Sequence, residues 1–153
     1  GRMHLLPRDT IRSRIDELLP LLGLEGEEKK LAVEYSHGMK KKLALAAALL
    51  PNPDLLFLDE PFEGVDAVTS RVIRDLLKGY VGRGSTVFLT SHVLEIVERL
   101  CTHVGIIVKG ELVEQAALEN LRQGKSLEER FLEKAGADSL ATPKISWLEE
   151  GGQ

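Results

Sequence analysis

Apolar residues in the first third of the chain recur at helical spacing. In residues 8–22 they fall three or four positions apart, which predicts an amphipathic helix that Pro20 should kink or end. One further turn is predicted over 27–33. Residues 39–50 are strong helix formers, and because their second half is apolar on every side, the pattern predicts a buried helix.

The rest of the chain alternates between strand-like and helix-like segments. Short apolar runs bounded by turn residues predict strands at 55–58, 86–90, 103–108 and, after a hairpin turn at Lys109-Gly110, 111–114. Helical spacing predicts helices at 66–80, 93–100, 117–122 and 127–134. The unbroken apolar run at 55–58 is typical of a strand buried on both faces. This order predicts a helical subdomain followed by an α/β layer with a mainly parallel sheet.

The same patterns divide the chain into four parts. We expect a helical subdomain over 1–50 and half of an α/β core over 51–115. C-terminal helices should follow over 116–136. Periodicity fades after that point, so we expect residues 137–153 to form a tail.

Composition and charge narrow the class of protein. The 153 residues are 43% hydrophobic and 29% charged, which is ordinary for a globular domain, and a net charge of −4 makes nucleic acid a poor partner. A single cysteine, Cys101, excludes an internal disulfide. No run of 18 apolar residues and no signal-peptide pattern is found, so a cytosolic domain is expected. The three lysines at 40–42 are interpreted as a solvated surface.

Three polar clusters stand where predicted strands end or helices begin. Asp59 and Glu60 follow one strand, His92 follows the next, and Ser36 and Gly38 open the apolar helix. Each cluster alone has an ordinary structural explanation as a cap, a helix start or a structural histidine. Together they suit a phosphate-handling site, because carboxylates at a strand end can serve magnesium and water. A glycine-containing helix start, in turn, offers N–H groups to an anion.

These clusters resemble the motifs of one ATPase family. Residues 35–39, Tyr-Ser-His-Gly-Met, resemble the signature motif of ATP-binding-cassette (ABC) ATPases, usually Leu-Ser-Gly-Gly-Gln. Residues 55–60 look like their Walker B strand, Gly64-Val65-Asp66 stands where their D-loop does, and Ser91-His92 looks like their switch histidine. The order and spacing of these motifs agree with the family's from about residue 5 to residue 134. The residues around the motifs are similar to those of ATPase subunits of ABC-2-type exporters.

The resemblance implies a P-loop NTPase fold and a set of catalytic roles. Asp59 would coordinate Mg²⁺, mostly through water, and Glu60 would polarise the water that attacks ATP. His92 would contact the γ-phosphate. The implied cofactors are therefore ATP and Mg²⁺.

The resemblance also implies a dimer of ATPase subunits. Ser36 and Gly38 would cap the γ-phosphate bound by the opposite subunit, and Asp66 would communicate across the dimer. His37 and Met39 depart from the family's usual signature, but the two residues implied to touch phosphate are kept.

One motif of the family is missing from the sequence. The phosphate loop (Walker A), Gly-x-x-x-x-Gly-Lys-Ser/Thr, does not occur, and the nearest string, 119–126, begins with glutamate and follows a predicted helix. We therefore expect this chain to be the C-terminal part of such an ATPase, with an incomplete fold and without activity alone. In the fold that this sequence resembles, the strand that carries the phosphate loop lies between the strands that correspond to 86–90 and 103–108.

Two functional hypotheses follow. The first is an ATP-hydrolysing subunit that powers a transporter from the cytoplasmic face of the cell membrane, and the resemblance implies that this transporter is an exporter. Its partners would be a transmembrane permease, a second ATPase subunit and the missing Walker A half. The second is a naturally short, non-catalytic binding module that docks on a transporter or ATPase partner. A scaffold without nucleotide is disfavoured, because Asp59, Glu60 and His92 would then have no reason to occur together.

Overall fold

A computed structural model describes residues 5–136 of the chain, which divide into two units. The first unit ends at His92 and the second begins at Val93, and each is described by itself. The expected tail at 137–153 lies outside the described residues. The four-part organisation expected from the sequence stays a prediction.

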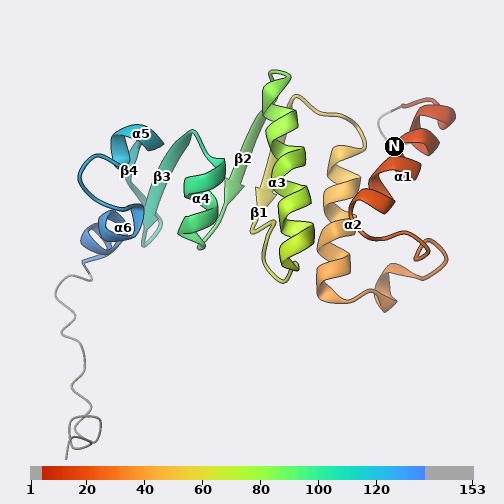
Figure 1. The fold of residues 1–153 in the computed structure, drawn as a ribbon, viewed down its shortest axis with the longest axis horizontal. Helices are drawn as coiled ribbons and strands as arrows, with labels where there is room; N and C mark the ends of the chain where they lie inside the picture. Colours follow the sequence, from red (N-terminus) through yellow and green to blue (C-terminus); the bar gives the residue numbers. More distant parts are fainter. Residues whose placement is uncertain (1–4, 137–153) are drawn as a thin grey trace, which may run out of the picture. The chain divides into compact units, whose positions relative to one another are not determined.

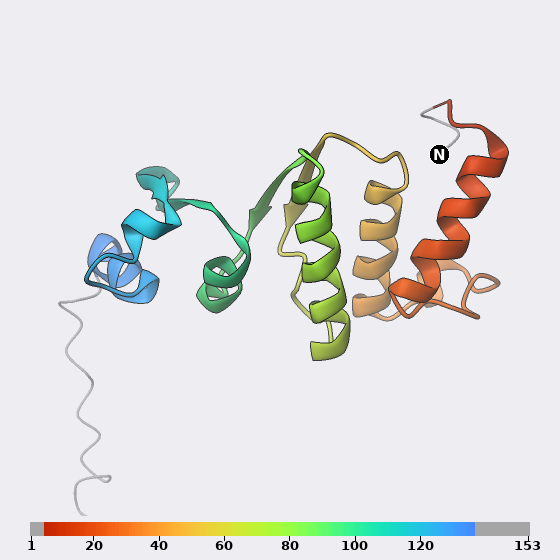
Figure 2. The same cartoon turned by 45° about the horizontal axis from the view of Figure 1, so that its top comes forward.

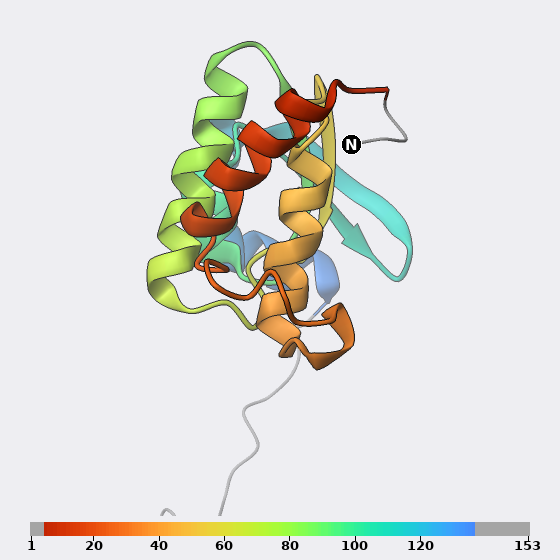
Figure 3. The ribbon, with the colours of Figure 1, turned by 90° about the vertical axis from the view of Figure 1, so that its right-hand side faces the viewer.

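The first unit contains helices and a short parallel sheet (Figure 1). Its elements are α1 Arg8–Leu21, the 3₁₀ turn η2 Ala32–Glu34, α2 His37–Leu49, β1 Leu55–Asp59, α3 Ala67–Gly82 and β2 Thr86–Thr90. Helices α1, α2 and α3 lie side by side (Figure 2), with α1 contacting α2 and running obliquely to it (Figure 3). Pro20 stands one residue before the end of α1, as the sequence predicts.

The sheet of the first unit is covered on one face and open on the other. Strands β1 and β2 pair in parallel, and α3 packs against β2. Because side chains alternate between faces, Leu56 is buried while Phe57 is 68% exposed and its pair Phe88 is 59% exposed. The two rings contact each other with their centroids 5.6 Å apart. The prediction that this strand is buried on both faces is therefore wrong for the described residues.

Helix α2 is also less buried than its sequence predicts. It buries Leu45, Ala46 and Leu49, but Ala44 and Ala47 are exposed. A groove of about 200 Å³ lies between this helix and β1. The second half of α2 is apolar all round, but only one side of the helix is buried against other parts of the first unit.

The second unit is an antiparallel hairpin packed with three helices. Its elements are α4 Leu94–Leu100, β3 His103–Val108, β4 Glu111–Ala117, α5 Leu118–Leu121 and α6 Leu127–Ala135. The strands turn at Lys109 and Gly110, both with positive φ, so the predicted hairpin is confirmed. Strand β4 runs three residues further than predicted, to Ala117, and α5 is correspondingly shorter. Buried apolar residues from these elements form one core, namely Val97, Ile106, Leu118, Leu121 and Leu127.

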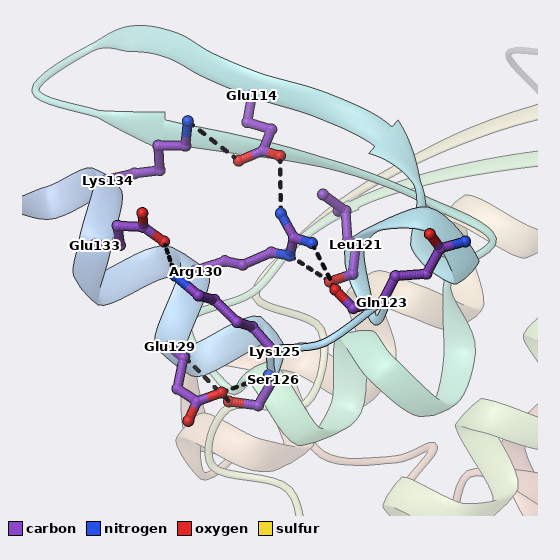
Figure 4. Close-up of polar contacts among 9 residues, drawn as sticks. All are labelled: Glu114, Leu121, Gln123, Lys125, Ser126, Glu129, Arg130, Glu133 and Lys134. Carbon is purple, nitrogen blue, oxygen red and sulfur yellow. Dashed lines mark hydrogen bonds and ion pairs between the residues drawn. The ribbon is translucent and has the colours of Figure 1, made fainter.

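An arginine of α6 ties the end of the second unit together. Arg130 donates to the backbone carbonyls of Leu121 and Gln123, and its guanidinium lies 3.5 Å from the Glu114 carboxylate of β4 (Figure 4). Lys134 approaches the same carboxylate to 3.6 Å. Because one side chain serves two carbonyls and a carboxylate, it fixes the turn between α5 and α6 against the hairpin.

The Gly-Lys-Ser string of the sequence lies in this same turn. Lys125 pairs with Glu133 at 2.8 Å, and Ser126 caps α6 in a reciprocal arrangement with Glu129 (Figure 4). The string therefore joins two helices, whereas a phosphate loop joins a strand to a helix. Among the described helices, none is long and apolar enough to cross a membrane.

Candidate functional site

The carboxylates predicted at the strand end lie at the shared carboxyl edge of β1 and β2. Asp59 is the last residue of β1 and pairs directly with Thr90, the last residue of β2. The Thr90 hydroxyl donates to Asp59 Oδ1 at 2.5 Å, and the hydroxyl oxygen of Thr90 accepts the N–H of Glu60 at 3.2 Å. Thr90 thus fixes both acidic residues to the neighbouring strand. Ligands bind at this edge in open parallel sheets.

Glu60 and His92 are in contact. Glu60 Oε1 lies 2.9 Å from His92 Nδ1. The glutamate side chain is 27% exposed and the imidazole 68% exposed, so the pair is open to solvent mainly on the histidine side. The two residues predicted as catalytic from separate strand ends are therefore brought together. A carboxylate that accepts from Nδ1–H fixes the orientation of the ring.

The start of α2 lies against the turn that follows β1. Ser36 is the N-cap of α2, and its hydroxyl accepts the N–H of Met39 at 3.2 Å. A Cβ at Gly38 would lie 2.7 Å from the carbonyl oxygen of Gly64, so any other residue there would force one of the two backbone segments to move. Gly64 has a φ of +70°, and a Cβ on it would meet the ring of His37. The predicted signature and D-loop segments thus touch within one chain.

Asp66 has a structural role at the end of the same turn. It is the N-cap of α3, where its carboxylate accepts the N–H of Thr69 at 2.9 Å and the hydroxyl of Thr69 at 2.7 Å. Lys42 Nζ lies 3.3 Å away. The two bonds from Thr69, and then Lys42, hold the pKa of the Asp66 carboxyl well below its usual value.

Two of the three consecutive lysines are not part of a solvated surface, which corrects the sequence-based interpretation. The side chains of Lys41 and Lys42 are only 22% and 13% exposed. Lys41 donates to the carbonyl of Glu60 at 3.1 Å and to Glu63 at 2.5 Å. The hydrogen bond from Lys41 to Glu63, together with the charge of Lys41, lowers the pKa of the Glu63 carboxyl. A sequence signal existed, since Lys41 and Lys42 stand three and four residues after Gly38 on α2.

The residues at this edge suit a metal ion that takes most of its ligands from water and phosphate and few from the protein. Between residues 5 and 136, no three histidine, cysteine or acidic side chains are placed to hold a metal ion. The oxygen atoms that the two strand ends offer to a metal ion are those of the Asp59 carboxylate and the neighbouring Thr90 hydroxyl. Such a set fits Mg²⁺, which keeps several waters and is commonly held by one or two carboxylates plus phosphate oxygens.

Comparison with known proteins gives the family. The family model described as "ABC transporter" matches residues 3–63. The bacitracin transport ATP-binding protein BcrA of Bacillus licheniformis is 42% identical over 113 residues, which cover 73% of this chain and 37% of that protein. The chain belongs to the ABC transporter ATPase family. A fluoroquinolones export ATP-binding protein of Mycobacterium tuberculosis is 40% identical over 97 residues, 63% of this chain and 32% of that protein.

The fold of this ABC ATPase chain is also seen in solved structures. An ATP-binding subunit of an ABC transporter superposes with a TM-score of 0.78 at 28% identity, covering 84% of this chain and 55% of that one. The predicted P-loop NTPase fold, present in part, is confirmed. The chain spans about a third to a little over half of these proteins, which is consistent with its being one portion of such a subunit.

Proposed function

We propose that this chain is the C-terminal portion of an ATP-hydrolysing subunit that powers an ABC exporter. The observation that carries the proposal is the 2.9 Å contact between Glu60 and His92, at the carboxyl edge of two parallel strands. A carboxylate and an imidazole fixed together beside Asp59 form an acid–base pair next to a place for Mg²⁺. The two relatives named above, a bacitracin transport protein and a fluoroquinolones export protein, support export as the direction.

Each residue of the pair has a distinct task in this proposal. Glu60 accepts a hydrogen bond from the attacking water and draws its proton, which makes the oxygen a better nucleophile. His92 uses Nδ1 to hold Glu60, which leaves Nε2 to contact the terminal phosphate. With a proton on each ring nitrogen, His92 would donate to both groups and stabilise developing negative charge. Asp59, held by Thr90, orients the water shell of the metal. Bound Mg²⁺–ATP supplies the phosphoryl group and charge neutralisation.

The start of α2 would serve a second subunit. Ser36 satisfies one N–H of the first turn, and the positive end of this 13-residue helix favours an anion. Ser36 and Gly38 would therefore contact the phosphate bound by the opposite subunit, and Asp66 would transmit changes across that interface. The chain itself would not hydrolyse ATP, because the phosphate loop is not among its motifs.

A permease in the membrane would be the other partner, with the ATPase peripheral on the cytoplasmic face of the cell membrane. The alternative is a non-catalytic module that docks on a transporter or ATPase partner. It would keep the exposed start of α2 as a binding surface but would not need the contact between Glu60 and His92.

Substitution of Glu60 in the full-length protein tests the proposal. In Glu60→Gln, ATP binding should stay within about threefold of the parent and hydrolysis should fall about 10²- to 10⁴-fold, because the amide keeps the shape but loses the charge that polarises water. Binding is measured by calorimetry and hydrolysis by phosphate release. Glu111→Gln, an exposed position at the start of β4, is the control. Equal hydrolysis by parent and Glu60→Gln would refute the catalytic proposal and favour the binding module.

A further inference from the structure

Glu60 has a backbone conformation that a glutamate rarely adopts. Its φ is +44°, in the left-handed region where the Cβ of an L-residue is crowded. Such a conformation is unfavourable for a non-glycine residue and persists only where surrounding contacts impose it. The contacts that impose it at Glu60 therefore decide where the carboxylate lies.

Three elements hold Glu60, each through a different group. Its N–H donates to the hydroxyl of Thr90 from β2, and its carboxylate contacts His92 from the segment after β2. Its carbonyl oxygen accepts a hydrogen bond from Lys41 of α2 at 3.1 Å. Of these three contacts, the one from Lys41 comes from a helix. As a charge-assisted donor it makes one of the stronger hydrogen bonds available to a carbonyl.

We propose that Lys41 is a positioning residue for Glu60: by binding the Glu60 carbonyl it keeps this residue in the left-handed conformation and its carboxylate against His92. The effect on hydrolysis rests on the function proposed above, whereas the effect on geometry does not. Lys41 itself touches neither nucleotide nor the reacting water in this assignment.

The surroundings of Lys41 make this role specific to it. The adjacent Lys42 turns to Asp66 at 3.3 Å, and Lys40 is exposed. The close approach of Gly38 to the Gly64 carbonyl brings the first turn of α2 against the segment after β1. Lys41 stands one turn further along the helix, where its ammonium reaches the carbonyl. Its ion pair with Glu63 at 2.5 Å keeps the side chain in this position.

The first test is structural and needs no hydrolysis. High-resolution structures of the full-length protein are determined for the parent and for Lys41→Met, which keeps the length but not the donor. We expect φ at Glu60 to leave the left-handed region and the distance between Glu60 Oε1 and His92 Nδ1 to exceed about 3.2 Å, the usual limit of a hydrogen bond. An unchanged Glu60 in Lys41→Met would overturn the proposal. Should that variant not fold, Lys41→Leu, which also lacks a donor, is examined with the same expectations.

The second test measures hydrolysis in the same variants. Lys41→Met should lower kcat about 10- to 100-fold with KM for ATP within twofold, because a misplaced base slows chemistry without changing binding. Lys41→Arg, which restores a charged donor, should recover most of kcat. Lys40→Met is the control, because Lys40 is exposed. A rise in KM with unchanged kcat, or no rescue by arginine, would overturn the positioning role.

The two tests separate failure of this inference from failure of the proposed function. If Glu60→Gln hydrolyses ATP normally but Lys41→Met still displaces Glu60, the positioning role stands and the catalytic proposal falls. If Glu60→Gln is inactive while Lys41→Met leaves both Glu60 and kcat unchanged, the catalytic proposal stands and the inference falls.

Discussion

Replacing Gly38 by alanine tests the contact between the start of α2 and the turn after β1. The new methyl group would lie 2.7 Å from the carbonyl oxygen of Gly64. A carbon and an oxygen in ordinary van der Waals contact lie about 3.5 Å apart, so one of the two segments must move by several tenths of an ångström. The obstacle is backbone, which cannot rotate away as a side chain would.

Two opposing effects set the magnitude. Alanine is better than glycine in a helix by about 0.8–1.0 kcal/mol. Overpacking against a fixed neighbour costs about 1–3 kcal/mol. We therefore expect Gly38→Ala to destabilise the protein by about 0–2 kcal/mol. Gly79 in α3 is the matched control, because a Cβ there meets nothing within 4 Å, and Gly79→Ala should stabilise by up to about 1 kcal/mol.

The assay is urea unfolding of the full-length parent and both variants, followed by circular dichroism. The predicted order of stability is Gly79→Ala, then the parent, then Gly38→Ala. Gly38→Ala should also slow hydrolysis, because the displaced turn carries the residues between Glu60 and Asp66. A Gly38→Ala protein as stable as Gly79→Ala, with normal turnover, would show that the two segments do not constrain each other.

Two further predictions concern a cap and the strand edges. Asp66→Asn should lower the melting temperature near pH 7. Because folding depresses the pKa of the Asp66 carboxyl, the difference in melting temperature from the parent should shrink as the pH falls below 3.8, the usual pKa of an aspartate. Asp75→Asn, exposed on the same helix, should show almost no effect, and a pH-independent loss in Asp66→Asn would contradict the assignment. The isolated chain should self-associate, as measured by light scattering. In the described residues β2 pairs only with β1 and β3 only with β4, so β2 and β3 each have one unpaired edge that can pair with another chain. A monodisperse monomer with strong amide protection along β2 and β3 would contradict this.

Much of the arrangement at the sheet edge could be predicted from the sequence. Apolar runs that end in Asp59-Glu60 and in Ser91-His92 predict two parallel strands with these residues at the same edge. The contact between Glu60 and His92 follows from that geometry. Ser36 could be predicted at a helix start because serine is a common N-cap.

The exposure of the sheet and the role of Lys41 could not be predicted in the same way. Whether Phe57 and Phe88 are buried depends on what covers that face, and the apolar run alone does not say. The contact of Lys41 with Glu60 joins residues 19 positions apart and depends on how α2 packs. Charge clusters are usually solvated, so two partly buried lysines among three are an exception that only packing reveals.

A double-mutant cycle between Glu60 and His92 tests the central claim most directly. Hydrolysis by the full-length protein is measured for the parent, Glu60→Gln, His92→Ala and the double variant, with His103→Ala as the histidine control in the second unit. If the two residues act as one pair, the double variant should be no slower than Glu60→Gln, while His103→Ala should change the rate by less than about twofold in either background. Multiplicative losses from Glu60 and His92 would contradict the account, because they would show that the two residues act independently.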